Sequence, residues 1–305
     1  MGSIIRIPRS LQRRIEDAAH AFLYPQNGRT VDFMQPLHEE ALICANSVSW
    51  QIFKNPIALF VGGVAAVILE LAEPAVRTGV WEHSRFRQDP IGRIQRTGLA
   101  AMITVYGPRS VAEPMIAGVC RMHAAVRGET VAGRPYSAQD PALLTWVQTT
   151  AIYGIAQAYS RYVTVLSPDE FDALYRESAP ASRLYGAHGA PTSANETEIL
   201  FESMRGRLEA SPIVVDFLRI MSEKMALPSP LQWLQPVLVR AAVEIVPAWI
   251  RERLGLSEAY ALAPHERWLV RRAGSLSNRI VLAESPPARA CRRLGLSMNH
   301  LYARP

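Results

Sequence analysis

One histidine of this chain lies in a setting that suits a metal ligand. His123 is part of the helix-compatible run 121–128, in which Met122, Ala124 and Val126 are apolar neighbours. An axial ligand of haem iron needs a neutral imidazole that projects from a rigid element into an apolar pocket. A single histidine on an apolar helix face is more often an ordinary core residue, so the pattern alone leaves both interpretations open.

Three polar residues upstream share one face of a predicted helix. Arg93, Arg96 and Thr97 are spaced i, i+3 and i+4, and Asp89-Pro90 marks the expected start of the helix. The ordinary interpretation is an exposed basic face. The alternative is a polar wall that faces His123 and handles a small bound molecule.

Two carboxylates could act beside this face. Glu70 ends a long apolar run, and Glu82 precedes His83 and a charged turn. A carboxylate buried near Arg93 would be paired with it and would stay charged. His83 could support such a site or lie on the surface, and the sequence favours neither.

Other metal and redox chemistry finds little support in the sequence. The remaining histidines show no HExxH or comparable spacing, and the three cysteines, Cys44, Cys120 and Cys291, form no CxxC pair. Scattered thiols in odd number predict neither a disulfide framework nor a zinc site, and they fit a reducing compartment. The first residues carry no signal-peptide or myristoylation pattern, so we expect a cytoplasmic protein.

The charge balance does not indicate a nucleic-acid partner. The chain has 33 lysines and arginines against 27 acidic residues, but the arginines form no basic stripe interleaved with aromatic residues. The uncharged apolar run 57–69 is shorter than the roughly 20 residues needed to cross a bilayer. We therefore expect no nucleic acid, no transmembrane segment and a buried core helix at 57–69.

Helical periodicity dominates the chain. Apolar residues at helical spacing predict helices over residues 11–22, 36–53, 57–71, 91–106, 112–127, 141–165, 168–179, 195–208, 213–225, 231–245, 247–254 and 265–282. Several begin with a capping residue followed by proline, as in Ser167-Pro168, and alternating strand patterns are nearly absent. We predict an all-α fold in a single multi-helical domain, 1–305. Gly62-Gly63 would admit either a neighbouring helix or a flat cofactor.

A series of short motifs follows the order found in a known family. They are Asn55-Pro56, Gly62-Gly63, Glu82-His83-Ser84-Arg85-Phe86-Arg87, Asp89-Pro90, Gly92-Arg93, Arg96-Thr97, His123, Tyr136-Ser137-Ala138, Asp140-Pro141 and Leu144-Thr145-Trp146-Val147. As a set they resemble the catalytic domain of the MpaB/rubber-oxygenase family of helical haem b proteins. Residues 50–186 form the core of this resemblance, and we expect 187–305 to be C-terminal helices that pack on it.

The resemblance implies haem b in a pocket between core helices, with His123 as the proximal iron ligand. It implies that Arg93 engages a propionate or a distal carboxylate and that Thr97 donates a hydrogen bond to bound oxygen. Arg96 stands where rubber oxygenases have a lysine able to bind iron. An arginine does not replace that lysine, because its guanidinium stays protonated, so we expect the sixth position to be open or water-bound.

The distal base implied by the family is one of the two carboxylates. We favour Glu82 slightly over Glu70, with His83 beside it. Three positions depart from the family pattern, since Ala65, Glu73 and Gln148 stand where arginine, histidine and histidine are common. These departures bear on the substrate and on oxygen handling rather than on the haem ligand.

The expected function is a haem-dependent oxygenase that uses dioxygen or peroxide to oxidise a small apolar or natural-product substrate. Such an enzyme could draw electrons from a redox partner. Two alternatives stay open, a haem-binding sensor or carrier without turnover, and a cofactor-free helical interaction protein.

Overall fold

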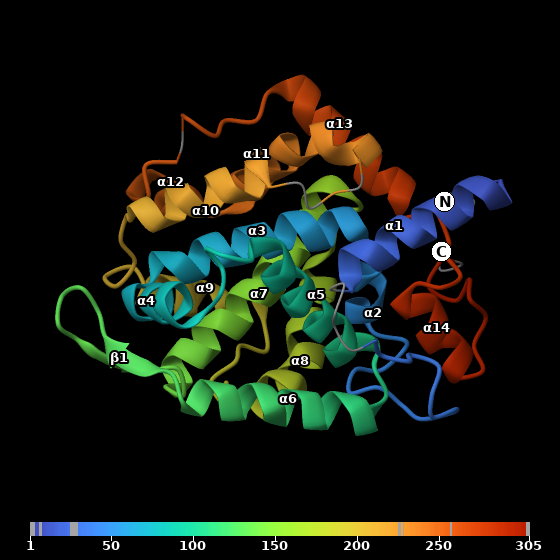
Figure 1. The fold of residues 1–305 in the computed structure, drawn as a ribbon, viewed down its shortest axis with the longest axis horizontal. Helices are drawn as coiled ribbons and strands as arrows, with labels where there is room; N and C mark the ends of the chain where they lie inside the picture. The colour runs from blue at the N-terminus through green and yellow to red at the C-terminus, as the bar shows by residue number, and fades with distance from the viewer. Residues whose placement is uncertain are drawn as a thin grey trace.

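Helices make up nearly all of the regular structure (Figure 1). The computed structural model describes residues 4–5, 8–24, 30–224, 227, 229–256 and 258–302. The elements are α1 Arg9–Leu23, α2 Val48–Phe53, α3 Pro56–Ala72, α4 Pro74–His83, α5 Pro90–Tyr106, α6 Arg109–Ala124, β1 Arg127–Glu129, β2 Pro135–Ser137, α7 Pro141–Tyr162, α8 Pro168–Leu184, α9 Ala194–Ser203, α10 Pro212–Glu223, the 3-10 helix η1 Ser229–Leu234, α11 Gln235–Ile245, α12 Ala248–Arg253, α13 Pro264–Ser277 and α14 Pro286–Arg293. The predicted all-α class is confirmed.

Helices α3 and α7 form the centre of the fold and pack along each other more extensively than any other pair. The contact is close because Gly62 meets Gly154 and Ile155 without side chains between them. A Cβ added at Gly62 would lie 2.5 Å from the Ile155 Cα, whereas one added at Gly63 would meet no atom within 4 Å. Gly62 therefore serves helix packing, and Gly63 borders open space.

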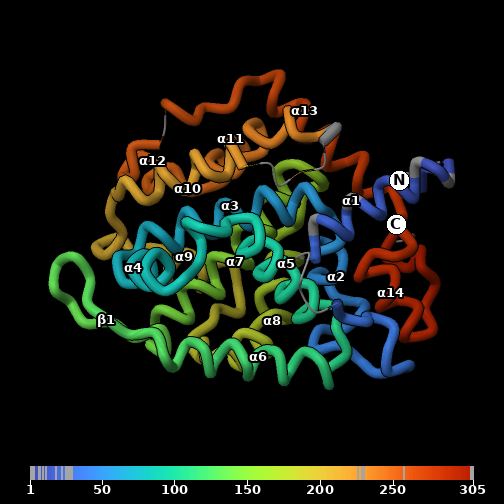
Figure 2. The backbone as a smooth tube through the Cα atoms, viewed as in Figure 1, coloured from blue at the N-terminus to red at the C-terminus, as the bar shows by residue number. Residues whose placement is uncertain are grey.

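The other helices cover this central pair from several sides. Helices α10, α11 and α13 contact α3, and α11 and α13 also contact α7. Figure 1 shows this C-terminal group on one side of α3, with α6 and α8 on the opposite side of the molecule. Helices α1 and α14 both contact α5, and the tube in Figure 2 shows them at one end of the fold.

Many helices begin where capping chemistry predicts. The Asn55 side chain accepts hydrogen bonds from the backbone of Ile57 and Ala58 at the start of α3, with Pro56 in the first turn. Ser167 and Glu170 form a reciprocal capping box on α8. These starts depend on residues that are neighbours in the sequence, which is why the sequence located them.

The predicted helix over 36–53 is wrong for most of its length, since only Val48–Phe53 is helical. The buried Arg293 of α14 donates hydrogen bonds to the carbonyl oxygens of Phe33 and Glu39, and its own carbonyl accepts one from the backbone N–H of His38. These bonds satisfy backbone groups that a helix would otherwise use. Hydrogen bonds to a residue about 250 positions away thus hold this segment in turns and bends.

Two helices were missed by the sequence reading. Helix α4 follows α3 after a sharp bend, where Glu73 caps the new helix by accepting a hydrogen bond from the Val76 N–H at 2.8 Å. Helix α14 lies in the last part of the chain and buries Arg293. The hairpin of β1 and β2 was also missed, because each strand has only three residues.

Membrane-spanning potential was assessed over the described residues alone. No single helix there combines the length and the apolar character that a bilayer crossing requires; α3 and α4 meet the criterion only as a pair bent by 108°. Most of α3 is buried in the protein core.

The α3–α7 contact can be tested by two neighbouring glycines. Gly62→Ala should lower the free energy of unfolding by about 1–3 kcal/mol, because the new Cβ would overlap the α7 backbone. Gly63→Ala is the matched control and should raise stability by up to about 1 kcal/mol through helix propensity. Urea unfolding of the full chain measures both, and equal effects would contradict the packing role of Gly62.

Candidate functional site

Arg93 lies about one turn after the start of helix α5. The Asp89 side chain accepts a hydrogen bond from the Gly92 N–H at 2.9 Å, and Pro90 occupies the first turn, so the helix begins where the sequence predicted. Arg93 is half-buried, whereas Arg96 and Thr97 are exposed. Arg96 forms an ion pair with Asp89 at 3.3 Å. Of the three predicted residues, only Arg93 is turned into the fold.

The carboxylate that acts on Arg93 is Glu70, near the end of α3. Burial raises the pKa of Glu70 to about 7, and the positive charge of Arg93 opposes this increase. Burial lowers the pKa of the Arg93 guanidinium, and the charge of Glu70 opposes that shift in turn. Glu70 therefore titrates near neutral pH, which is what a group that exchanges protons at pH 7 requires.

His123 lies in the last turn of α6 and is half-buried. Burial lowers its pKa below 6.5, and the nearby charge of Arg93 lowers it further, so the ring is neutral at pH 7. Its Nδ1 atom is buried and has no hydrogen-bond partner within the described structure. A neutral imidazole with an unpartnered buried nitrogen has the form that an iron ligand requires.

Arg93 thus links the two predicted halves of the site. Its charge acts on Glu70 from α3 and on His123 from α6. The structure brings α3, α5 and α6 together, although Glu70 and His123 lie 53 positions apart in the sequence. The family resemblance predicted Arg93 and His123 in one site and slightly favoured Glu82 as the carboxylate, whereas the carboxylate whose charge acts on Arg93 is Glu70.

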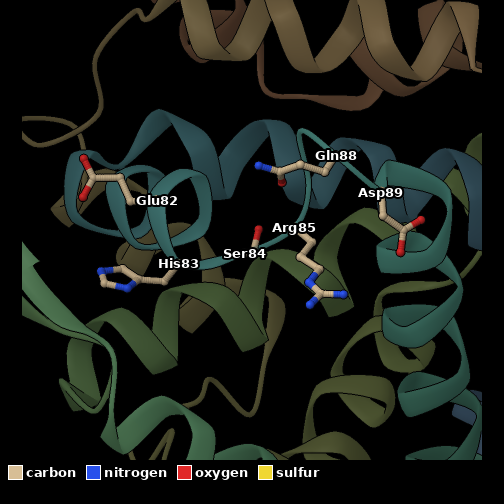
Figure 3. Close-up of a pocket in the computed structure, with 6 residues that line it drawn as sticks. All are labelled: Glu82, His83, Ser84, Arg85, Gln88 and Asp89. Carbon is tan, nitrogen blue, oxygen red and sulfur yellow. The ribbon is translucent and has the colours of Figure 1, made fainter.

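Glu82 and His83 end α4 and are both exposed. They line an open pocket of about 580 Å³ along the α4–α5 loop, together with Ser84, Arg85, Gln88 and Asp89 (Figure 3). The charge of Glu82 raises the pKa of Tyr136 in β2, after the larger effect of burial. Glu82 therefore faces the hairpin, and Glu70 is the carboxylate next to Arg93.

A second cavity of about 160 Å³ opens beside His123. It is lined by Cys120 and His123 of α6, by Gln139, Pro141 and Leu144 at the start of α7, and by Tyr185, Gly186 and His188 after α8. The Tyr185 hydroxyl is hydrogen-bonded to Thr104 of α5 at 2.9 Å. Sequence analysis missed this lining, although the spacing of Cys120 and His123 by one helical turn could have indicated a shared face.

Each of the two central helices has a row of partly exposed residues along one face, which we call a stripe, although both helices lie in the otherwise buried core. On α7 the stripe is Leu144, Gln148, Ala151 and Ile152, spaced i, i+4, i+7 and i+8. On α3 it is Gly63, Val67 and Glu70. Such stripes suit a mainly apolar group held inside the fold.

The described residues contain no group of three or more His, Cys, Asp or Glu side chains that could hold a bare metal ion. His123 could instead serve a cofactor that takes a single protein ligand on one face. A comparison with protein families bears on the class of protein. A family model described as the catalytic domain of the ER-bound oxygenase mpaB/B' and rubber oxygenase matches residues 50–279. The chain belongs to this family.

The MpaB/rubber-oxygenase match confirms the predicted resemblance and covers residues 50–279, which includes the expected core 50–186. The C-terminal helices through α13 therefore belong to the oxygenase catalytic domain. No curated protein matched the chain, and no solved structure did.

One of the three positions expected to depart from the family pattern has a structural role. Glu73 is buried, forms an ion pair with Arg207 at 2.8 Å and caps α4. Beside it, Arg77 forms an ion pair with Glu209 at 2.5 Å and donates a hydrogen bond to the Leu71 carbonyl. These contacts fix the bend between α3 and α4 against the loop after α9. Ala65 is fully buried, and Gln148 lies on the α7 stripe.

The raised pKa of Glu70 predicts a pH-dependent effect on stability. Its folded-state pKa of about 7 exceeds the ordinary value of 4.5, so ionising Glu70 costs more in the folded chain, and this cost develops as the pH rises between those values. Glu70→Gln should therefore raise the free energy of unfolding by about 1–3 kcal/mol at pH 8 and by less than about 0.5 kcal/mol at pH 4.

Urea unfolding at the two pH values measures the effect. Glu82→Gln is the control, because the exposed Glu82 should give changes within about 0.5 kcal/mol at both. A gain at Glu70 that is independent of pH would contradict a buried carboxyl with a raised pKa.

Proposed function

We propose that this chain is a haem b-dependent oxygenase that acts on a small apolar substrate with dioxygen or peroxide. The observation that carries the proposal is the arrangement around Arg93. On one side is the neutral His123 with an unpartnered buried nitrogen, and on the other is Glu70 with a pKa near neutral. Membership in an oxygenase family makes haem the cofactor that suits this single ligand.

The residues present fit a haem. His123 would hold the iron, and the apolar stripe of α7 would contact the porphyrin. Arg96 is engaged with Asp89 on the surface, and a guanidinium does not bind iron. Arg96 would therefore not hold the iron. When bound, the haem supplies the oxidising power, and the protein supplies orientation, a dry pocket and proton control.

The carboxylate oxygens of Glu70 would accept and hold the proton that the reaction exchanges. With a pKa of about 7 it is a stronger base than an ordinary glutamate, and a useful fraction is still deprotonated at pH 7. The guanidinium of Arg93 keeps that pKa from rising further. Arg93 is therefore a positioning residue that acts through Glu70. Thr97 is exposed on α5, and its proposed contact with bound oxygen requires the cofactor to reach that face.

The class of reaction decides whether a redox partner is needed. Cleavage of a carbon–carbon double bond by dioxygen gives two carbonyl groups and consumes no external electrons. Hydroxylation by dioxygen inserts one oxygen atom and reduces the other to water, which consumes two external electrons and two protons. Hydroxylation by peroxide also forms one water but consumes no external electrons or protons. We include an electron-donating partner only for hydroxylation by dioxygen.

The three cysteines bear on the compartment. Cys44, Cys120 and Cys291 are all free thiols. Free thiols are the ordinary state of cysteine in a reducing compartment, and this supports a cytoplasmic location as part of the proposal.

The cofactor can be tested by an ultraviolet-visible spectrum of the purified full chain, as isolated and after dithionite with carbon monoxide. We expect a Soret band that shifts on carbon monoxide binding. His123→Ala should lose haem during purification, whereas His188→Ala, which removes a histidine from the same cavity, should keep it. Haem retention in His123→Ala would overturn the ligand assignment, and a colourless reconstituted protein would overturn the oxygenase proposal.

Turnover tests the proton-handling role. Oxygen consumption with a panel of isoprenoid alkenes should rise with pH through an inflection near pH 7 as Glu70 ionises. Glu70→Gln should keep the Soret band and lose about 100-fold or more in turnover. Arg93→Gln should shift the inflection to higher pH, because the charge that stabilises the carboxylate is removed. An unchanged pH profile in Arg93→Gln would contradict the coupling of these residues.

A further inference from the structure

Haem b carries two propionates, and the polar residues considered so far leave them without a dedicated cation. Arg93 is coupled to Glu70, and Arg96 is paired with Asp89. A carboxylate at the edge of a pocket is best held by a guanidinium, which can donate two parallel hydrogen bonds to it. The question is which arginine of the site is available.

The pocket along the α4–α5 loop contains such a group. Arg85 is the one arginine or lysine among its lining residues. Its side chain is exposed and has neither an ion pair nor a hydrogen bond within the described part of the chain. The neighbouring Arg87 differs, because it lies outside the lining and its guanidinium stands 5.7 Å from the centre of the Trp81 ring.

The backbone that carries Arg85 is firmly held. The next residue, Phe86, is 4% exposed and packs against Phe217 at a ring distance of 5.5 Å. The Arg85 carbonyl accepts hydrogen bonds from the backbone N–H of Gln88 at 3.1 Å and of Asp89 at 2.7 Å. With Phe86 fixed inward, Arg85 is presented to the pocket, and Figure 3 shows Arg85 and Glu82 pointing in different directions from the loop.

This pocket adjoins the candidate haem site at two places. Asp89, at one end of its lining, caps the helix that carries Arg93 one turn later. Glu82, at the other end, acts on Tyr136 of the hairpin that begins directly after α6, where His123 ends the helix.

We propose that Arg85 binds a propionate of haem b and so sets the orientation of the cofactor over His123. This inference rests on the proposed function, because it requires a haem. It assigns the α4–α5 loop as the wall against which the polar edge of the porphyrin lies. Arg93 is then left to act on Glu70.

The test uses haemin titrations of the full chain, prepared without cofactor and followed at the Soret band. The variants are Arg85→Ala, Arg85→Lys and the control Arg87→Ala, which removes the same charge two residues away. Each titration is repeated with haemin dimethyl ester, in which both propionates are blocked. Thermal unfolding without haem establishes that each exposed substitution leaves the fold intact.

We expect Arg85→Ala to weaken haemin binding by about 10-fold or more, as loss of a charge-assisted hydrogen bond requires. Its affinity for the dimethyl ester should match that of the wild type. Arg85→Lys should retain part of the haemin affinity, and Arg87→Ala should retain all of it. This pattern would support a contact between Arg85 and a propionate.

Other results would overturn the inference in distinguishable ways. An Arg85→Ala variant that binds haemin like the wild type, or that loses affinity equally for haemin and its ester, excludes the propionate contact while leaving the haem proposal standing. A wild type that binds haemin no better than His123→Ala does would overturn the proposed function and this inference together.

Discussion

The close contact between α3 and α7 is the constraint on which the rest of the structure depends. Gly62 and Gly154 bring two helix backbones together at a distance that no side chain would allow. Because α10, α11 and α13 all contact α3, and α11 and α13 also contact α7, the spacing of α3 and α7 fixes where these three helices pack. It also fixes the stripe of α3 that ends in Glu70 relative to the stripe of α7 that faces the candidate pocket. The chemistry of the site is therefore set by packing in a region that carries no functional side chain.

The bend between α3 and α4 and the spacing between α3 and α7 together shape the candidate pocket. The charged residues Glu73, Arg77, Arg207 and Glu209 hold the bend, and the side chains of Glu73 and Arg77 are 4% and 9% exposed. Their partners Arg207 and Glu209 are 43% and 57% exposed, so removing either partner would leave a buried charge on Glu73 or Arg77 without its counter-charge, which is unfavourable. The network thus directs α4 and the following loop back across the core. Without the bend, Asp89 could not start α5 where Arg93 reaches both Glu70 and His123.

A single cation then influences two titrating groups in the same direction. The charge of Arg93 lowers the pKa of His123, which keeps the ring neutral, and it limits the rise in the pKa of Glu70 that burial causes. Both effects favour the forms that ligand binding and proton transfer need near pH 7. Burial and the charge of Arg93 act in the same direction on His123 and in opposite directions on Glu70.

The sequence by itself determined the helical class and the starts of α3, α5 and α8, because caps, prolines and helical spacing act over a few neighbouring residues. Its short motifs made Arg93 and His123 candidates only through their resemblance to a family. Only the tertiary structure decided that Gly62 packs while Gly63 does not, that Glu70 rather than Glu82 lies beside Arg93, and that residues 36–47 are not helical. Those outcomes depend on partners far away in the chain, as with Arg293 and the Phe33 carbonyl. Short stretches of sequence determine local hydrogen bonding, whereas burial and charge coupling arise only when distant segments meet.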